Sequence, residues 1–448
     1  MNQIEIVPVQ NSIMKLLERI AKYDTVIFLA FKIVCDYIYW KYICDIYSYS
    51  GSIAEPSISK NIFGWIALVV LLLLYNNISK GDIKFCVSFL MTLSIIPTLS
   101  VFWIRNESII CFFEILIYWI IFEVTAIIFS RQKRKIRKEK CDLKLKNNSI
   151  IFAIWVVAII CTVFFSYKYG EFRFWVSFED VYEYRLDTSN QMNVVERYIF
   201  GWTSSIFIPL CFSIHTINKR WLFAVVDVCL SLMSYAIYGN KVIVFQIVVV
   251  IGLLLIIKNS YNYCLGSVIC ILCTGASLLA VLIYNILGNK IPLSLCMRVF
   301  FIPSEAHYYY FDFFQTEPLL LLRQSVLRHF FSNPLSDTAA VLIGSDVRYN
   351  LTGGYNNLNN GLFSDAYQNF GFVGVLIYPF VVVFFLFLLC KVLKDFNPLI
   401  KYSLLIGLVF SMFSGYLFSW LLSGGVILVF IIVYLIKHYR IRIDTGDT

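Results

Sequence analysis

The residues best suited to acid–base chemistry stand in one long polar segment, which runs from about Gly288 to Phe380. Glu305 and His307 come near its start and Asp365 near its end, whereas the chain on either side is almost unbroken hydrocarbon. A carboxylate or an imidazole within hydrogen-bond reach of a hydroxyl group can remove the proton of that group. We therefore predict that these three residues are the candidate general bases.

A second set of side chains suits an anionic or glycan substrate. Arginine makes bidentate contacts with phosphate oxygens, and lysine supplies a compact point charge. Aromatic rings suit the faces of sugars. The predicted substrate-binding residues, for pyrophosphate and glycan together, are Arg173, Arg185, Lys241, Arg298, Tyr309 and Asn369.

Simpler explanations stay open for several of these residues. Arg173 and Arg185 could pair with acidic neighbours in a solvated loop, and Lys241 could extend from a helix end toward the interface. Arg298 could form a salt bridge with Glu305, and His307 could be structural because it stands in an aromatic run.

The elements that must position these residues are membrane helices. The chain has 448 residues, of which 59% are hydrophobic and only 15% are charged. Runs of about 20 apolar residues follow one another, and each is long enough to cross about 30 Å of hydrocarbon. The strands of a transmembrane β-barrel need only about ten residues of alternating polarity, so the length of these apolar runs argues against a barrel. We predict an all-α, polytopic helical membrane protein with about twelve transmembrane helices.

The basic loop Arg131–Lys146 sets the predicted orientation, because lysine and arginine favour the cytoplasmic side. It places both termini in the cytoplasm and two long loops outside, 168–197 and 288–369, the latter between the ninth and tenth spans. In the first apolar run, Lys32 and Asp36 either pair at i,i+4 spacing or face a cavity. The predicted spans are about 26–46, 62–75, 85–104, 109–129, 150–167, 198–217, 221–238, 242–257, 264–287, 370–391, 402–418 and 421–436.

Charge and cysteine content limit the functional classes. The net charge of +9 is explained by basic inner loops rather than by nucleic-acid binding. Most of the 13 cysteines lie within apolar runs, where they act as small hydrophobic residues. The long late segment holds only Cys296, so we expect no disulfide framework, no metal site and no cofactor.

The stretch NNGLFSDAYQNFGFVGVLIYPF, from Asn359 to Phe380, resembles a segment of the O-antigen polymerases, the oligosaccharide repeat-unit polymerases of bacterial surface polysaccharides. Supporting similarities are YGNK at 238–241, RVFFIPSEAHYYYFDFF at 298–314 and YEYRLDTS at 182–189. The arrangement of about twelve spans with a large, late outer loop is also similar.

This resemblance implies a membrane-embedded, inverting and metal-independent glycosyltransferase of the bacterial inner membrane. Its substrate would be an oligosaccharide repeat unit on undecaprenyl pyrophosphate, and membrane lipid, a chain-length regulator and a flippase are the candidate partners. The outer arginines of the family would correspond to Arg185 and Arg298, and its motif acid to Asp365. Which acid serves as the base is left open.

Two other activities remain open beside the polymerase. An O-antigen ligase shares the layout and uses outer arginines with a loop histidine, for which His307 or His329 is available. A transporter of polysaccharide or lipid-linked sugar should show repeats and polar residues at the middle of its helices. We expect an apolar midplane here, with the charge outside it, and this expectation disfavours a transporter. A purely structural membrane protein would leave the ionisable cluster unexplained.

Overall fold

The computed structural model describes residues 23–132, 149–170, 188, 191–239, 241–257, 265–352, 357–413 and 415–444. Every regular element in these ranges is helical. Nine helical segments among them are long and apolar enough to cross a membrane, which confirms a polytopic helical membrane protein. These are Ile58–Asn76, Asp82–Ile104, Ile109–Ser130, Ser149–Tyr169, Val194–Ile217, Trp221–Tyr238, Leu265–Leu287, Phe363–Asp395 and Leu417–Lys437.

The remaining predicted spans are also helical. Ile243–Leu254 and Pro398–Phe413 are shorter apolar helices. The first run forms one continuous helix from α2 (Asp24–Ile38) through the π-helical turn η1 (Tyr39–Ile43) to α3 (Cys44–Ile46). Within it the Lys32 ammonium donates to Asp36 at 2.5 Å, which confirms the i,i+4 pair.

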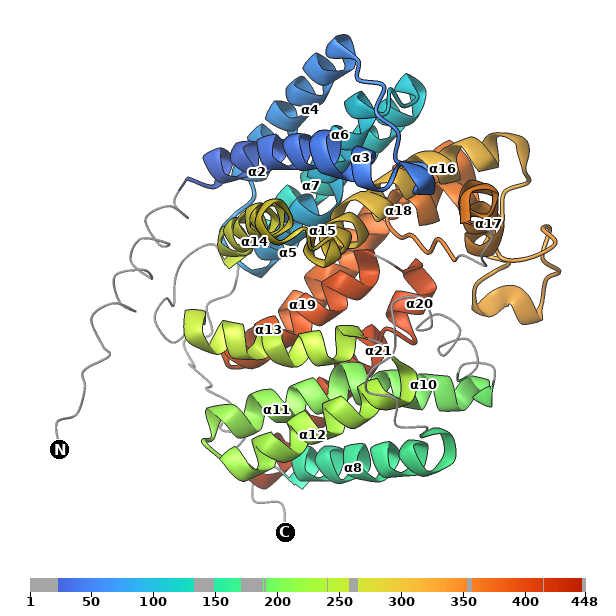
Figure 1. Ribbon diagram of the computed structural model, residues 1–448. Helices are drawn as coiled ribbons and strands as arrows, with labels where there is room; N and C mark the ends of the chain where they lie inside the picture. The colour runs from blue at the N-terminus through green and yellow to red at the C-terminus, as the bar shows by residue number, and fades with distance from the viewer. Residues whose placement is uncertain are drawn as a thin grey trace. The chain divides into compact units, whose positions relative to one another are not determined.

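The chain forms two compact units (Figure 1). Unit 1 comprises Met1–Lys135, Asn262–Leu388 and Met412–Phe418, and unit 2 comprises Ile136–Tyr261, Leu389–Ser411 and Ser419–Thr448. Glu305, His307, Asp365 and their neighbours all belong to unit 1, so that unit carries the candidate site.

Unit 1 is built around one fully enclosed span. The helices α5 (Asp82–Leu90) and α6 (Ile96–Ile104) are joined by the π-helical turn η3 (Met91–Ile95), and every residue from Asp82 to Ile104 is buried. Helices of the same unit pack against this span on several sides. They are α2, α4 (Ile58–Asn76), α7 (Ile109–Ser130), α14 (Leu265–Leu287) and α16 (Ile302–Thr316).

The segment predicted as the late outer loop is mostly helical. It contains α15 (Ile291–Cys296), the π-helical turn η6 (Met297–Phe301), α16, the short helix η7 (Val326–His329) and α17 (Ala339–Thr352). It also reaches into the bundle, because His307 Nε2 lies 3.4 Å from Oγ of Ser94, near the middle of the enclosed span.

The tenth span begins earlier than predicted. Its helix, α18 (Phe363–Val392), starts at Phe363, and a break at Gly371 divides it. Gly371 has φ +54°, a left-handed conformation that glycine adopts without strain. The predicted start near Phe370 therefore corresponds to this break, and residues 363–369 belong to a helix rather than to a loop.

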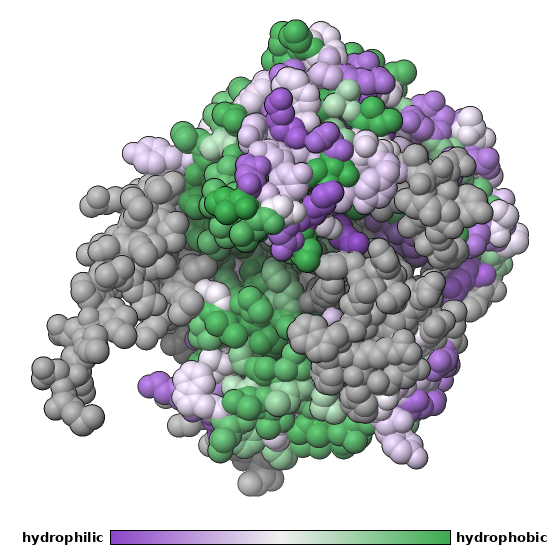
Figure 2. All heavy atoms as spheres, viewed as in Figure 1, coloured by the Kyte–Doolittle hydropathy of each residue, from purple (hydrophilic) through white to green (hydrophobic). Residues whose placement is uncertain are grey.

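Unit 2 consists of α8 (Ser149–Tyr169), α10 (Val194–Trp202), η5 (Thr203–Phe207), α11 (Ile208–Ile217), α12 (Trp221–Tyr238), α13 (Lys241–Ile257), most of α19 (Pro398–Phe413), part of α20 (Leu417–Leu421) and α21 (Val426–Asp444), with the end of α18 and η8 (Leu393–Asp395). Asn193 and Glu196 form a reciprocal capping box at the start of α10. In Figure 2 apolar side chains cover much of the visible face of this unit, as expected for a surface that meets lipid.

The predicted spans are not purely apolar inside. Glu123 in α7 and Asp227 in α12 are each 0% exposed within helices long and apolar enough to cross a membrane, and Lys32 is 0% exposed in α2. Asp227 accepts from Trp155 Nε1 at 2.9 Å and contacts His215 Nδ1 at 2.6 Å. Neither carboxyl oxygen of Glu123 has a hydrogen-bond partner in the described part of the chain.

Candidate functional site

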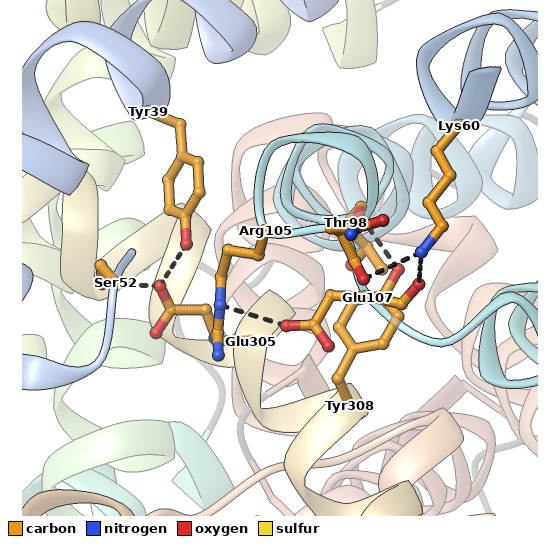
Figure 3. Close-up of polar contacts among 9 residues, drawn as sticks. Tyr39, Ser52, Lys60, Thr98, Arg105, Glu107, Glu305 and Tyr308 are labelled. Carbon is orange, nitrogen blue, oxygen red and sulfur yellow. Dashed lines mark hydrogen bonds and ion pairs between the residues drawn. The ribbon is translucent and has the colours of Figure 1, made fainter. Parts of the chain in front are cut away.

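Glu305 lies in the first turn of α16, where its side chain is 1% exposed. Tyr39 Oη donates to its Oε1 at 2.6 Å, and Ser52 Oγ donates to the same oxygen at 2.7 Å (Figure 3). Oε2 accepts no hydrogen bond from the described residues. One carboxyl oxygen is therefore held in place while the other remains available to a ligand.

Arg105 faces this carboxylate from the turn between α6 and α7. Figure 3 shows its guanidinium group between the carboxyl groups of Glu305 and Glu107. Arg105 Nε lies 3.1 Å from Glu107 Oε1, and its Cζ lies 4.8 Å from the centre of the Tyr309 ring. Arg105 forms no direct ion pair with Glu305, although the two groups interact electrostatically.

Lys60 of α4 fixes the turn that carries Arg105. Its ammonium group donates to the backbone oxygen of Asn106 at 2.8 Å and to that of Glu107 at 2.6 Å. Asn106 itself adopts φ +57°, a left-handed conformation that asparagine tolerates better than most residues. The lysine thus satisfies two carbonyl groups of residues that lie between the helices α6 and α7.

The Arg105 site, defined here as Arg105, Glu107, Glu305, Tyr309 and Asp312, is rich in carboxyl groups. Burial raises the pKa of Glu107 to about 7, and the neighbouring carboxyl groups of Asp312 and Glu305 act in the same direction, against Arg105 and Lys60. Burial also raises the pKa of Asp312. A carboxyl group that titrates near neutral pH can exchange a proton with a substrate.

His307 points into a different network, although it follows Glu305 by only two residues. Its Nδ1 lies 2.7 Å from Ser364 Oγ and 3.0 Å from Asn360 Nδ2. Asn360 Nδ2 also donates to Pro303 O at 3.0 Å. The imidazole is 1% exposed and connects α16 to the enclosed span and to the start of α18, which is a structural arrangement.

Asp365 and Asn369 hold together parts of unit 1 that are distant in the sequence. Asp365 Oδ2 accepts from the Leu417 backbone N–H at 2.7 Å, and its Oδ1 accepts from Gln368 and Asn369 at 3.0 and 2.9 Å. Asn369 Oδ1 in turn accepts from the Leu322 backbone N–H at 2.8 Å. Both oxygens of Asp365 are thus occupied by donors from the chain itself.

The other predicted site residues have different positions. Tyr309 lies against Arg105, and Arg298 is an exposed residue of η6. Lys241 is the first residue of α13 in unit 2, and its side chain lies outside the described set. Arg173 and Arg185 also lie outside the described residues. From the predicted set, the structure thus brings Glu305 and Tyr309 together at Arg105, and it brings Asp365 and Asn369 together in a separate network.

Sequence reasoning missed Tyr39, Ser52, Lys60, Arg105 and Glu107. A usable signal was present in Arg105-Asn106-Glu107, a short charged turn between two long apolar runs. Orientation by the basic loop places this turn on the same predicted face as the late segment. No group of three or more His, Cys, Asp or Glu residues that could hold a metal ion occurs among the described residues.

No protein-family model, no curated protein sequence and no solved structure matches this chain.

Proposed function

We propose that this protein polymerises oligosaccharide repeat units carried on undecaprenyl pyrophosphate, on the outer face of a bacterial inner membrane and with both termini in the cytoplasm. The observation that carries the proposal is the position of an arginine beside a buried, oriented carboxylate at one end of the enclosed span. Tyr39 and Ser52 hold Oε1 of Glu305, and Arg105 stands beside it. The similarity of the late segment to O-antigen polymerases supplies the reaction class.

In the proposed reaction a hydroxyl oxygen of the acceptor repeat unit attacks the anomeric carbon of the donor glycan. The bond from that carbon to the pyrophosphate oxygen breaks, and the new glycosidic bond forms with inversion. Glu305 Oε2 takes the proton of the hydroxyl group, and the carrier pyrophosphate leaves with the electron pair of the broken bond. Arg298 is exposed on η6, and we assign to it the contact with the pyrophosphate.

The test is a deletion strain of the source organism whose surface glycan is examined on a gel. Without the gene, we expect surface glycan that carries only one repeat unit. When the wild-type gene is restored, we expect a ladder of bands that differ by one repeat unit. Glu305→Gln should abolish the ladder at normal membrane levels, because an amide cannot take the proton. Glu317→Gln is the matched control, since Glu317 is an exposed residue at the other end of α16.

A full ladder from Glu305→Gln would remove Glu305 from the mechanism while leaving the polymerase in place. Polymer that accumulates on the lipid carrier without being attached would instead identify a ligase. An unchanged glycan profile on deletion would refute both activities.

A second candidate is a transporter of lipid-linked glycan. The buried Glu123 favours it, because an ionisable group without a hydrogen-bond partner inside a spanning helix is costly and commonly functional. Loss of a transporter would leave repeat units on the inner leaflet, inaccessible to a glycan-modifying enzyme added outside. Loss of a polymerase would leave single units accessible there.

A further inference from the structure

We propose that the Arg105 site recognises uncharged sugar hydroxyl groups and excludes phosphate. This inference rests on the proposed function, because it assigns the glycan of the substrate to this site and leaves the pyrophosphate of the carrier to another part of the protein.

The charges around Arg105 are the first argument. Its guanidinium group contacts Glu107 at 3.1 Å and interacts electrostatically with Glu305, while Asp312 acts on both Arg105 and Glu107. The nearby Lys60 ammonium is committed to two backbone carbonyl groups. One guanidinium group therefore faces three carboxyl groups. A pyrophosphate needs an excess of positive charge, and this site offers none.

The unsatisfied hydrogen-bonding atoms are the second argument. Arg105 Nη1 is a buried donor without a partner in the described part of the chain. Glu107 Oε1 is a buried acceptor without an aligned hydrogen bond, and Glu305 Oε2 accepts none. Buried polar atoms are normally paired, so these atoms indicate a polar ligand. Neighbouring sugar hydroxyl groups can accept from Arg105 and donate to an oxygen of each carboxyl group, whereas an ionised phosphate can only accept.

The shape of the site is the third argument. Glu305 is 1% exposed, the side chains of Glu107 and Arg105 are 12% and 14% exposed, and Asp312 is exposed. Exposure therefore rises from Glu305 toward Asp312, so the Asp312 side is the solvent side of the site. Tyr309, which packs against the guanidinium group, adds a partly buried aromatic ring to the same site. Aromatic rings pack well against the apolar faces of sugar rings.

The test uses the purified full-length protein in lipid nanodiscs and two kinds of probe. A panel of methyl glycosides of common hexoses and N-acetylhexosamines is followed by saturation-transfer NMR, and inorganic pyrophosphate is followed by phosphorus line broadening. The variants are Arg105→Met, Arg105→Gln and the double variant Glu107→Gln with Glu305→Gln. Lys80→Met is the control, because Lys80 is an exposed base in the turn between α4 and α5. Size-exclusion profiles report folding, and Arg105→Gln replaces Arg105→Met if the latter aggregates.

We expect at least one glycoside to give a signal that falls at least tenfold in the Arg105 variants and is unchanged in Lys80→Met. Pyrophosphate should show no Arg105-dependent broadening on the wild type. The double variant, which keeps the guanidinium group and loses two carboxylates, should gain pyrophosphate broadening. Each of these results supports the proposal.

Pyrophosphate broadening on the wild type that Arg105→Met removes would overturn it. So would the failure of every glycoside in the panel, or a double variant that gains no pyrophosphate binding. The glycan ladder tests the polymerase separately. If the protein binds glycosides but its deletion leaves the ladder intact, the sugar site stands and the polymerase is rejected. If the ladder depends on the gene but no glycoside binds, the polymerase stands and the sugar site is rejected.

Discussion

Replacing Glu107 by glutamine should change how stability depends on pH. The pKa of Glu107 rises from its ordinary value of 4.5 to about 7 on folding, chiefly through burial. The folded protein therefore holds this proton more tightly than the unfolded chain does. The resulting stabilisation is complete below about pH 4.5 and is lost as the pH rises through about 7. Glutamine does not titrate, so Glu107→Gln should lack this dependence.

The magnitude follows from the pKa interval. At about 1.36 kcal/mol per pH unit, the interval from 4.5 to about 7 corresponds to about 3 kcal/mol. A change of 1 kcal/mol shifts the melting temperature of a domain of 150–250 residues by about 2–4 °C. The melting temperature of Glu107→Gln relative to wild type should thus rise by about 6–12 °C between pH 4.5 and pH 8.

The assay is thermal unfolding of the detergent-solubilised protein, followed by tryptophan fluorescence at a series of pH values. Differences between variant and wild type cancel the contributions of groups unaffected by the substitution. Glu317→Gln serves as control, and its difference from wild type should not follow this window. If Glu107→Gln and wild type lose stability in parallel from pH 4.5 to 8, the description of Glu107 as a buried, proton-holding carboxyl group is refuted.

Three further substitutions test the architecture of unit 1. Gly361→Ala would place a Cβ atom 2.3 Å from Met412 O, which should destabilise the fold by about 1–3 kcal/mol in melting experiments, whereas Gly275→Ala meets nothing within 4 Å and should not. Lys60→Met leaves the Asn106 and Glu107 carbonyl groups unpaired, so it should lower both the ladder yield and the melting temperature. Equal ladder yields from Lys60→Met and Lys60→Arg would count against the role of Lys60 in holding the turn. Asp365→Asn should cost about 1–3 kcal/mol of stability, because asparagine keeps only one of the two oxygens that accept from the Leu417 N–H and from the Gln368 and Asn369 amides. Glycoside binding should persist in this variant. Loss of the glycoside signals in a well-folded Asp365→Asn protein would return Asp365 to the site.

Most spans were predictable because they are continuous apolar runs with polar ends. The helix Trp221–Tyr238 has the predicted bounds, and Ile109–Ser130 differs from its prediction by one residue. Starts of helices that begin in polar sequence were harder to predict. The start of α18 at Phe363 precedes the apolar run, because Ser364, Asp365 and Asn369 are satisfied by tertiary hydrogen bonds that no local pattern reveals.

The candidate site was predictable only in part. Glu305 could be selected from its surroundings in the chain, but its donor Tyr39 is 266 residues away in sequence. Such a pairing depends on how helices assemble and not on local spacing. The residues around Asp365 stood out in the sequence, but their contacts in the structure are with other parts of the chain. Asn360 donates to the Pro303 carbonyl group, Asp365 accepts from the Leu417 backbone N–H, and Asn369 accepts from the Leu322 backbone N–H.

The enclosed span Asp82–Ile104 also has a consequence for biosynthesis. It carries Ser88, Thr92, Ser94, Thr98 and Ser100, all buried, and several of these hydroxyl groups donate back to the carbonyl group four residues earlier. Part of its cover, α14 and α16, is encoded about 160 residues or more after the span ends and is translated only after helices α8 to α13 of unit 2. A nascent chain that has just inserted this helix therefore presents a hydroxyl-bearing face to lipid, or to an insertion factor, until the second half of the chain emerges. Co-translational quality control would meet that face first.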